Sequence, residues 1–140
     1  MADDAEIRVR QSFARQGLMA ALGASLQTLA PGRAEIVVVP VGGIAQQHGL
    51  VSAIADSAAG YAALSLMPAD REARITEFKI NFLAPAKGDR MIARARVVKS
   101  GSALTLVQSE VFVDNGGQER LVALLTATVM SVDADGEAAD

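Results

Sequence analysis

The stretch LVSAIADSAAGYAALSLM, from Leu50 to Met67, decides the fold, and Asp56 is its only charged residue. Its apolar residues surround a helical projection on nearly all sides, which is typical of a buried helix. The stretch approaches the length of a membrane span, but Asp56, three serines and a glycine interrupt it, which favours a helix inside a soluble protein. Burying a carboxylate is costly unless it is paired or hydrogen-bonded. We therefore expect Asp56 to be functional; the alternative is a capped, structural aspartate.

The elements before this helix can be read from apolar spacing and turn residues. Residues 5–23 are predicted to form one amphipathic helix, and residues 24–29 and 33–40 two strands separated by a Pro31-Gly32 turn. Residues 41–49 read as a Gly-rich loop that leads into the long helix. The predicted apolar face of the first helix consists of Phe13, Gly17, Leu18, Ala21 and Leu22.

After the long helix the pattern is that of an antiparallel sheet. Residues 74–83 alternate, so that Thr76, Phe78, Ile80 and Phe82 are expected on one face. Three long strands follow, and two Gly-containing turns, at 100–102 and 114–117, join them as hairpins. Their predicted bounds are 90–99, 103–113 and 119–132.

The element order predicts an α+β chain with a single domain over residues 1–132 and an acidic flexible tail over 133–140. A helix that is apolar nearly all round must be covered on most sides. An antiparallel sheet wrapped around one long central helix does this, and this arrangement is the hotdog fold. The alternative is a two-layer α+β sandwich, which would leave one face of the helix in water.

Composition narrows the function classes. The formal net charge is −3 with a pI near 5.1, so nothing favours nucleic-acid binding. The 140-residue chain has no cysteine and one histidine, which argues against disulfides and against a zinc or iron site. The first ten residues are charged and lack the apolar core of a secretory signal. We expect a cytoplasmic protein that is not bound to a membrane.

Three segments carry a resemblance to a known family. They are Gln46-Gln47-His48-Gly49, the helical segment Ala55–Ala63 with Asp56, and Glu77–Pro85, which ends in Phe-Leu-Ala-Pro. In this order they resemble hotdog-fold thioesterases of the phenylacetate-degradation type over roughly residues 10 to 130. The resemblance implies hydrolysis of acyl-CoA thioesters by a small homodimer or homotetramer, a dimer of dimers with active sites at the subunit interface. It implies no metal and no organic cofactor.

The turn before the helix departs from the family pattern. Asp56 follows His48 one residue sooner than is usual, and Gly49 is followed by Leu50 instead of a second glycine. In one alignment His48 is the motif histidine and one glycine is missing. In the other, Gln46 to Gly49 match a preceding loop, and the segment with the motif histidine is absent. Both alignments leave Asp56 in place.

The chemistry of thioester hydrolysis suggests roles for these residues. Asp56 is expected to act as general base on water or as a direct nucleophile, with Gln47, His48 and Gly49 as further catalytic candidates. The helix start offers backbone N–H groups near Gly49 and Leu50 to a carbonyl oxygen. The predicted substrate-binding residues are Gln46, Leu50, Ser57, Thr76 and Asn81.

The sequence favours a hydrolase of aryl- or medium-chain acyl-CoA, with two alternatives. A non-catalytic acyl-CoA-binding module would follow if the shortened turn disabled the carbonyl site. A hotdog hydratase or dehydratase would depend on His48 alone, because the chain has no second histidine.

Overall fold

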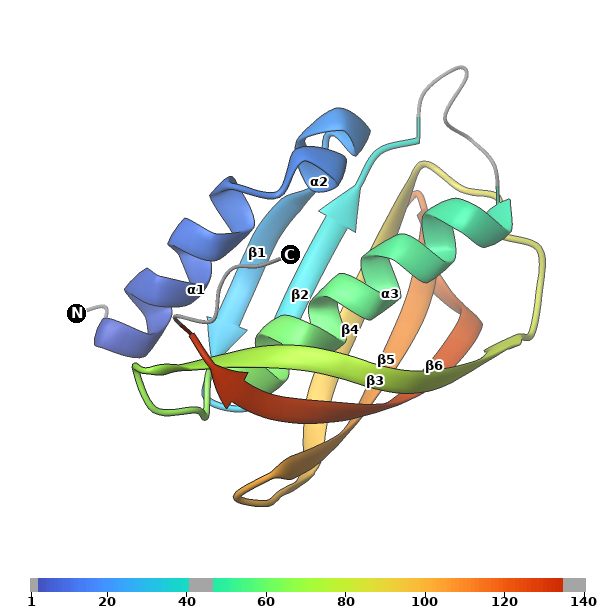
Figure 1. Ribbon diagram of the computed structural model, residues 1–140. Coiled ribbons are helices and arrows are strands. Elements are labelled where there is room, and N and C mark those ends of the chain that lie inside the picture. The colour runs from blue at the N-terminus through green and yellow to red at the C-terminus, as the bar shows by residue number, and fades with distance from the viewer. Residues whose placement is uncertain (1–2, 41–46, 135–140) are drawn as a thin grey trace.

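The computed structural model describes residues 3–40 and 47–134. The described residues form three helices and six strands (Figure 1). In chain order these are α1 (Asp4–Ala14), α2 (Gly17–Leu22), β1 (Ser25–Ala30), β2 (Arg33–Val38), α3 (Gln47–Leu64), β3 (Arg71–Phe82), β4 (Arg90–Ser100), β5 (Leu104–Asn115) and β6 (Gln118–Asp133).

The six strands form one antiparallel sheet in the order β1-β2-β4-β5-β6-β3. The sheet curls so that α3 lies in its concave face and contacts every strand from β2 to β6 (Figure 1). Helix α1 lies beside β1 and the C-terminal half of α3. This arrangement confirms the predicted hotdog fold.

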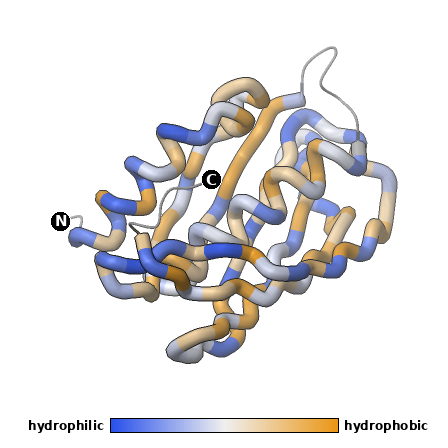
Figure 2. The backbone as a smooth tube through the Cα atoms, viewed as in Figure 1, coloured by the Kyte–Doolittle hydropathy of each residue, from blue (hydrophilic) through white to orange (hydrophobic). Residues whose placement is uncertain are grey.

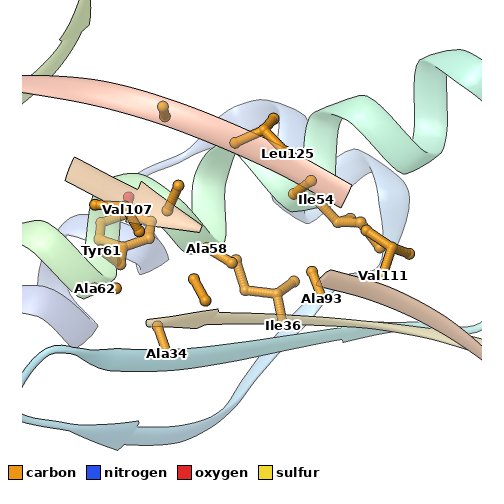
Figure 3. Packing of buried hydrophobic residues seen from close by; sticks show 14 of the residues in the cluster. Ala34, Ile36, Ile54, Ala58, Tyr61, Ala62, Ala93, Val107, Val111 and Leu125 are labelled. Atoms are coloured by element: carbon orange, nitrogen blue, oxygen red, sulfur yellow. The ribbon is translucent and has the colours of Figure 1, made fainter. Parts of the chain in front are cut away.

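Alanines of α3 allow the sheet to approach the helix closely. Ile54, Ala58 and Ala62 lie at helical spacing and are fully buried, and Figure 3 shows them among inward side chains of the sheet. The inward residues labelled there include Ile36, Ala93, Val107, Val111 and Leu125, each with essentially no exposed surface. Because these positions alternate along their strands, the pleat itself directs them at the helix.

The face of α3 that points away from the sheet differs from the prediction. Ser52, Ala53, Asp56, Ser57 and Gly60 are only partly buried and follow the i, i+4, i+8 spacing of one helical stripe. The single chain therefore leaves one face of α3 partly open. This face consists of small residues and one carboxylate. The sequence predicted that the sheet would cover the helix on most sides and did not predict an open face.

Strand β3 begins earlier than predicted and contains a bulge at Thr76. Beyond the bulge, Phe78, Ile80 and Phe82 share one face of the strand as predicted. They pair with the buried residues of β6, so this face is the one toward α3. Thr76 does not continue this alternation, because the bulge inserts an extra residue into the strand. Phe78 and Phe82 remain 45% and 42% exposed, since β3 is an edge strand of the sheet that the described residues form.

The single helix predicted for residues 5–23 is wrong, because the chain breaks between Ala14 and Gly17. Gln16 is extended, with φ −78° and ψ 108°, and its carbonyl caps the start of α2. The buried residues are Val9 and Met19, whereas Leu18 is 56% exposed. Figure 2 shows the corresponding alternation of hydrophilic and hydrophobic residues along α1.

The other predicted bounds lie close to the observed ones. Helix α3 begins at Gln47, so the predicted loop 41–49 contributes its last three residues to the first helical turn. The remainder of that loop, 41–46, lies outside the described residues, as does the predicted flexible tail beyond residue 134. Strand β6 extends to Asp133. No described helix is long and apolar enough to cross a membrane.

Candidate active site

Asp56 lines a cavity of about 510 Å³ between α1, α3 and β3. Its neighbours on the same stripe of α3, Ser57, Gly60, Tyr61 and Leu64, form the floor. Residues of α1 and the following turn form one wall, and the first residues of β3 form the other. The volume is that of a small-molecule site.

Burial raises the pKa of the Asp56 carboxyl above its ordinary value of 3.8. Within the described part of the chain, the carboxylate accepts no hydrogen bond and forms no ion pair, so nothing there offsets the loss of hydration. The hydroxyl of the neighbouring Ser57 does not bond to it. A carboxylate with a raised pKa and open lone pairs is suited to accept a proton from water near neutral pH.

Tyr61 joins the floor of the cavity to the wall formed by α1 and the following turn. Its hydroxyl accepts a hydrogen bond from Nε2 of Gln16 at 2.6 Å and lies 3.3 Å from Oγ of Ser12. Tyr61 is 5% exposed, and its ring meets Phe13 edge-to-face, with centroids 5.9 Å apart. Tyr61 thus holds the N-terminal segment against α3 and fixes the position of the cavity wall.

The predicted residues at the start of α3 lie apart from Asp56. His48 is exposed and its ring stacks on Phe82. Gly49 is exposed, whereas Leu50 is 4% exposed and packs in the core, so its side chain is not a substrate contact. Gln47 begins the helix, and Gln46 lies outside the described residues.

The two predicted residues of β3 also lie outside the cavity. Thr76 is at the bulge, and its hydroxyl donates to the carbonyl of Thr128 at 3.3 Å. Asn81 is exposed and pairs with Leu124, on the face of the sheet away from α3. Of the predicted site residues that the structure describes, Asp56 and Ser57 alone line the cavity.

Gly49 and Asp56 lie on one face of the same continuous helix, seven residues apart. At about 1.5 Å per residue this separates them by roughly 10 Å along the axis. One thioester carbonyl cannot contact both positions within a single chain.

The cavity contains basic residues that the sequence reasoning missed. Arg8, Arg15, Arg71 and Arg74 all line it. The spacing of Arg8, Ser12 and Arg15 is that of one helical face and was the available signal. Asp56 and Glu72 are the carboxylates of the lining, and no three His, Asp or Glu side chains gather as a metal site within 3–40 and 47–134.

The basic residues of the β4 hairpin are instead engaged with protein groups. Arg94 donates from Nε to Glu35 at 2.8 Å, and its two terminal nitrogens reach Glu119 at 2.6 and 2.8 Å. Arg90 pairs with Asp114 at 3.0 Å. These side chains are therefore less available to a ligand than their charge suggests.

Comparison with known proteins agrees with the fold. The sequence matches the Thioesterase superfamily over residues 48–119, about half of the chain. A thioesterase family protein from Silicibacter pomeroyi is 43% identical, with 93% of this chain and 99% of that chain covered and a TM-score of 0.90. No curated protein sequence matches the chain.

Two more distant structures share the fold. A thioesterase from Haemophilus influenzae is 15% identical with a TM-score of 0.78, over 95% of this chain and 93% of that one. The PaaI protein of the E. coli phenylacetic acid degradation operon is 23% identical with a TM-score of 0.79, over 91% and 93%.

These matches define a hotdog-fold thioester hydrolase. The chain belongs to the thioesterase superfamily. This assignment favours hydrolysis over the hydratase and binding-module alternatives.

Proposed function

We propose that the protein hydrolyses an aryl- or medium-chain acyl-CoA thioester to the free acid and CoA, with Asp56 as the catalytic carboxylate. The observation that carries the proposal is the placement of Asp56: it is the only charged side chain in the apolar stretch Leu50–Met67, and it faces a cavity of about 510 Å³ without a hydrogen-bond partner among the described residues. A cytoplasmic location is part of the proposal and is supported by the cysteine-free sequence.

Asp56 has two chemically consistent roles. As general base, it takes a proton from water while the water oxygen attacks the carbonyl carbon; the C–S bond then breaks and the thiolate takes up a proton. As nucleophile, it forms an anhydride and releases the thiolate, and water then hydrolyses the anhydride. In both routes the carbonyl oxygen gains negative charge, which the positive end of a helix dipole stabilises.

The second half of the site is proposed to come from a partner subunit, because Gly49 and Asp56 of one chain are roughly 10 Å apart. A homodimer formed through α3 and β3 would place the start of one α3 near Asp56 of the other. Supporting this, Phe78 and Phe82 expose apolar rings on the inner face of an edge strand, and α3 has a stripe of small residues beside them.

Association of two such dimers into a tetramer is proposed through the outer face of the sheet. Val98, Leu104, Leu106 and Met130 are 39–51% exposed there at the ends of neighbouring strands. Sedimentation distinguishes monomer, dimer and tetramer. A monomer with full activity would contradict the shared site.

The activity is tested by free-thiol release from phenylacetyl-, hydroxyphenylacetyl-, benzoyl- and short- to medium-chain acyl-CoAs. We expect Asp56→Asn to lower kcat by a factor of about 100 or more, as for loss of a general base. Asp70→Asn is the matched control, because Asp70 is exposed in the turn before β3 and does not line the cavity. Near-normal turnover in Asp56→Asn would refute the assignment.

The shared site is tested by mixing two variants that are each inactive. Asp56→Asn lacks the base, and Gly49→Val places a side chain where the carbonyl is expected. If the site combines residues of both subunits, re-associated mixtures contain hybrid dimers with one intact site, and about a quarter of the wild-type activity returns. If both residues act within one chain, every subunit in the mixture still lacks one of them. The identity of its partner then makes no difference, and no activity returns.

A further inference from the structure

The cavity beside Asp56 carries more positive charge than hydrolysis itself requires. Four arginines line it against two carboxylates, in a chain whose formal net charge is −3. A local excess of positive charge in a concave site of an acidic protein favours an anionic ligand. The arginines are Arg8, Arg15, Arg71 and Arg74.

Two of these arginines are held by the protein. Arg8 donates to the carbonyls of Leu64 and Met67, at 3.1 and 2.7 Å, and so caps the C-terminal end of α3. Arg71 donates from Nε to Oγ of Ser131 at 2.9 Å and forms an ion pair with Asp133. Both contribute positive potential to the cavity. All three nitrogens of Arg71 are engaged, whereas Arg8 uses one terminal nitrogen and its buried Nε has no partner among the described residues.

The other two have donors to spare. The guanidinium of Arg15 makes no hydrogen bond or ion pair with any residue that the structure describes. Among the described residues Arg74 approaches only Glu72, at 3.9 Å, and the two side chains are 62% and 53% exposed. Such a surface ion pair contributes little stability, so Arg74 can exchange Glu72 for a ligand that binds it more strongly. A carboxylate can accept two parallel hydrogen bonds from a guanidinium, which is a stronger contact.

Neighbouring contacts place the backbones of both arginines beside one level of α3. Arg15 precedes Gln16, which donates to the Tyr61 hydroxyl. Arg74 precedes Ile75, whose Cδ1 would lie 3.9 Å from a Cβ on Gly60. Because side chains alternate along a strand, Arg74 leaves β3 on the face opposite to Ile75, where it pairs with Met130, and it lines the cavity from this edge strand. Gly60 and Tyr61 follow Asp56 by four and five residues, so this level lies about 6 to 7.5 Å along the helix axis from the catalytic carboxylate.

An acyl-CoA offers two kinds of anion, the phosphates of CoA and a carboxylate at the far end of the acyl group. An extended carbon chain advances about 1.3 Å per bond, so five or so bonds span an axial separation of this size. The pantetheine arm, with its two amide units, separates the thioester from the phosphates by a longer extended chain. We therefore propose that the cavity takes a short acyl group with a terminal carboxylate, bound by Arg15 and Arg74.

This inference rests on the proposed thioesterase function and narrows its substrate to an ω-carboxyacyl thioester. It is tested with adipoyl-CoA and hexanoyl-CoA, which have acyl chains of equal length and differ in the carboxylate. Arg15→Gln and Arg74→Gln are compared with Arg33→Gln, an exposed arginine of β2 outside the cavity. The N-acetylcysteamine thioesters of the same acyl groups have no phosphate, so their rates of hydrolysis depend on the binding of the acyl group and not on the phosphates.

We expect the wild-type protein to prefer adipoyl-CoA in kcat/KM by about 10-fold or more, on the scale of one charge-assisted contact. Arg15→Gln and Arg74→Gln should each remove most of this preference, leave hexanoyl-CoA nearly unchanged, and act equally on the N-acetylcysteamine thioesters. Equal losses on both CoA substrates that vanish on N-acetylcysteamine would assign the arginines to the phosphates and overturn the proposal. Unchanged rates would overturn it as well.

Calorimetric binding of adipate and hexanoate separates this inference from the proposed function. Adipate that binds the wild-type protein, and binds Arg15→Gln at least about 10-fold more weakly, supports the anion site even if no thioester is hydrolysed. Hydrolysis of hexanoyl-CoA without detectable binding of adipate or preference for adipoyl-CoA leaves the function standing and refutes the inference.

Discussion

The imidazole ring of His48 stacks on the ring of Phe82, with centroids 4.1 Å apart and planes inclined by 22°. This contact joins the first turn of α3 to the last residue of β3. It gives the single histidine of the chain a packing role that needs no proton transfer. The same contact turns the ring toward the exposed edge strand, where the proposed partner subunit would lie.

His48→Phe and His48→Ala distinguish packing from chemistry. We expect His48→Phe to keep the stack and retain kcat within a few-fold, and His48→Ala to lower the free energy of unfolding by about 0.5–1 kcal/mol. Both should lose less turnover than Asp56→Asn. Free-thiol release and thermal melts measure the two effects. A loss in His48→Phe equal to that in Asp56→Asn would show that the imidazole acts in the reaction and would favour the alignment in which it is the motif histidine.

The raised pKa of Asp56 predicts the pH dependence of activity. Only the ionised carboxylate can act as base or nucleophile, so kcat/KM should rise with pH and level off above an apparent pKa that exceeds 3.8. The pH–rate profile for the best substrate measures this rise in kcat/KM. An apparent pKa at or below 3.8 would mean that a group other than Asp56 limits the reaction.

The same shift predicts how Asp56→Asn changes stability. Between pH 3.8 and the raised pKa, the folded chain holds a proton that the unfolded chain has lost, so the free energy of unfolding falls as pH rises through this window. Below this pH window Asp56 is protonated in both the folded and the unfolded chain, so the cost of burying its charge is absent. Asp56→Asn should therefore melt higher than wild type at pH 7 and equally at pH 3. Equal melting temperatures at both pH values would contradict the burial of the charge.

The elements that the sequence predicts well are those whose signals are local. The apolar stretch Leu50–Met67 specifies α3, and the glycine turns near 101 and 116 specify hairpins, because each needs only its own residues. The sheet order then has few alternatives around a helix that must be covered. Asp56 stood out for the same reason, as a charge where burial was already expected.

The parts that were missed depend on contacts between distant segments. The break after Ala14 lets Gln16 reach Tyr61, a partner 45 residues away. The bulge at Thr76 is visible only in the pairing of β3 with β6. The arginines of the cavity come from α1, the following turn and β3, which the fold brings together around Asp56. No pattern within any one segment contains these relations.

The ion-pair network of Arg94 predicts a role in stability without a role in substrate binding. Its hydrogen bonds hold the pKa of Glu119 below the ordinary value of 4.5, and its guanidinium lies 5.0 Å from the ring centroid of Phe112. Arg94→Gln should lower the melting temperature at pH 7 and leave KM unchanged. Because a lowered carboxyl pKa contributes stability that is lost as pH falls, the difference should shrink at pH 3.

Arg96→Gln is the control for Arg94, since Arg96 reaches only the neutral side chain of Gln108 among the described residues, at 2.8 Å. We expect a smaller change in melting temperature that does not depend on pH in the same range. A KM for acyl-CoA that rises in Arg94→Gln, with stability unchanged, would reassign this arginine to the phosphates of CoA.

Ser109 predicts a substitution that stabilises the fold. It lies on β5 with no exposed surface, between Ala95 and Leu125 in the sheet register, and its hydroxyl makes no hydrogen bond with any described atom. A buried polar group without a partner costs about 1–3 kcal/mol, so Ser109→Ala should raise the free energy of unfolding by about 1 kcal/mol. Ser65→Ala is a control of opposite sign, because Oγ of Ser65 donates to the carbonyl of Ala62 at 2.7 Å and accepts from the N–H of Gly32 at 2.8 Å. Denaturant unfolding measures both. If Ser109→Ala is also destabilised, the hydroxyl has a partner in solution, such as a buried water, and the core beneath α3 is wetter than its apolar lining indicates.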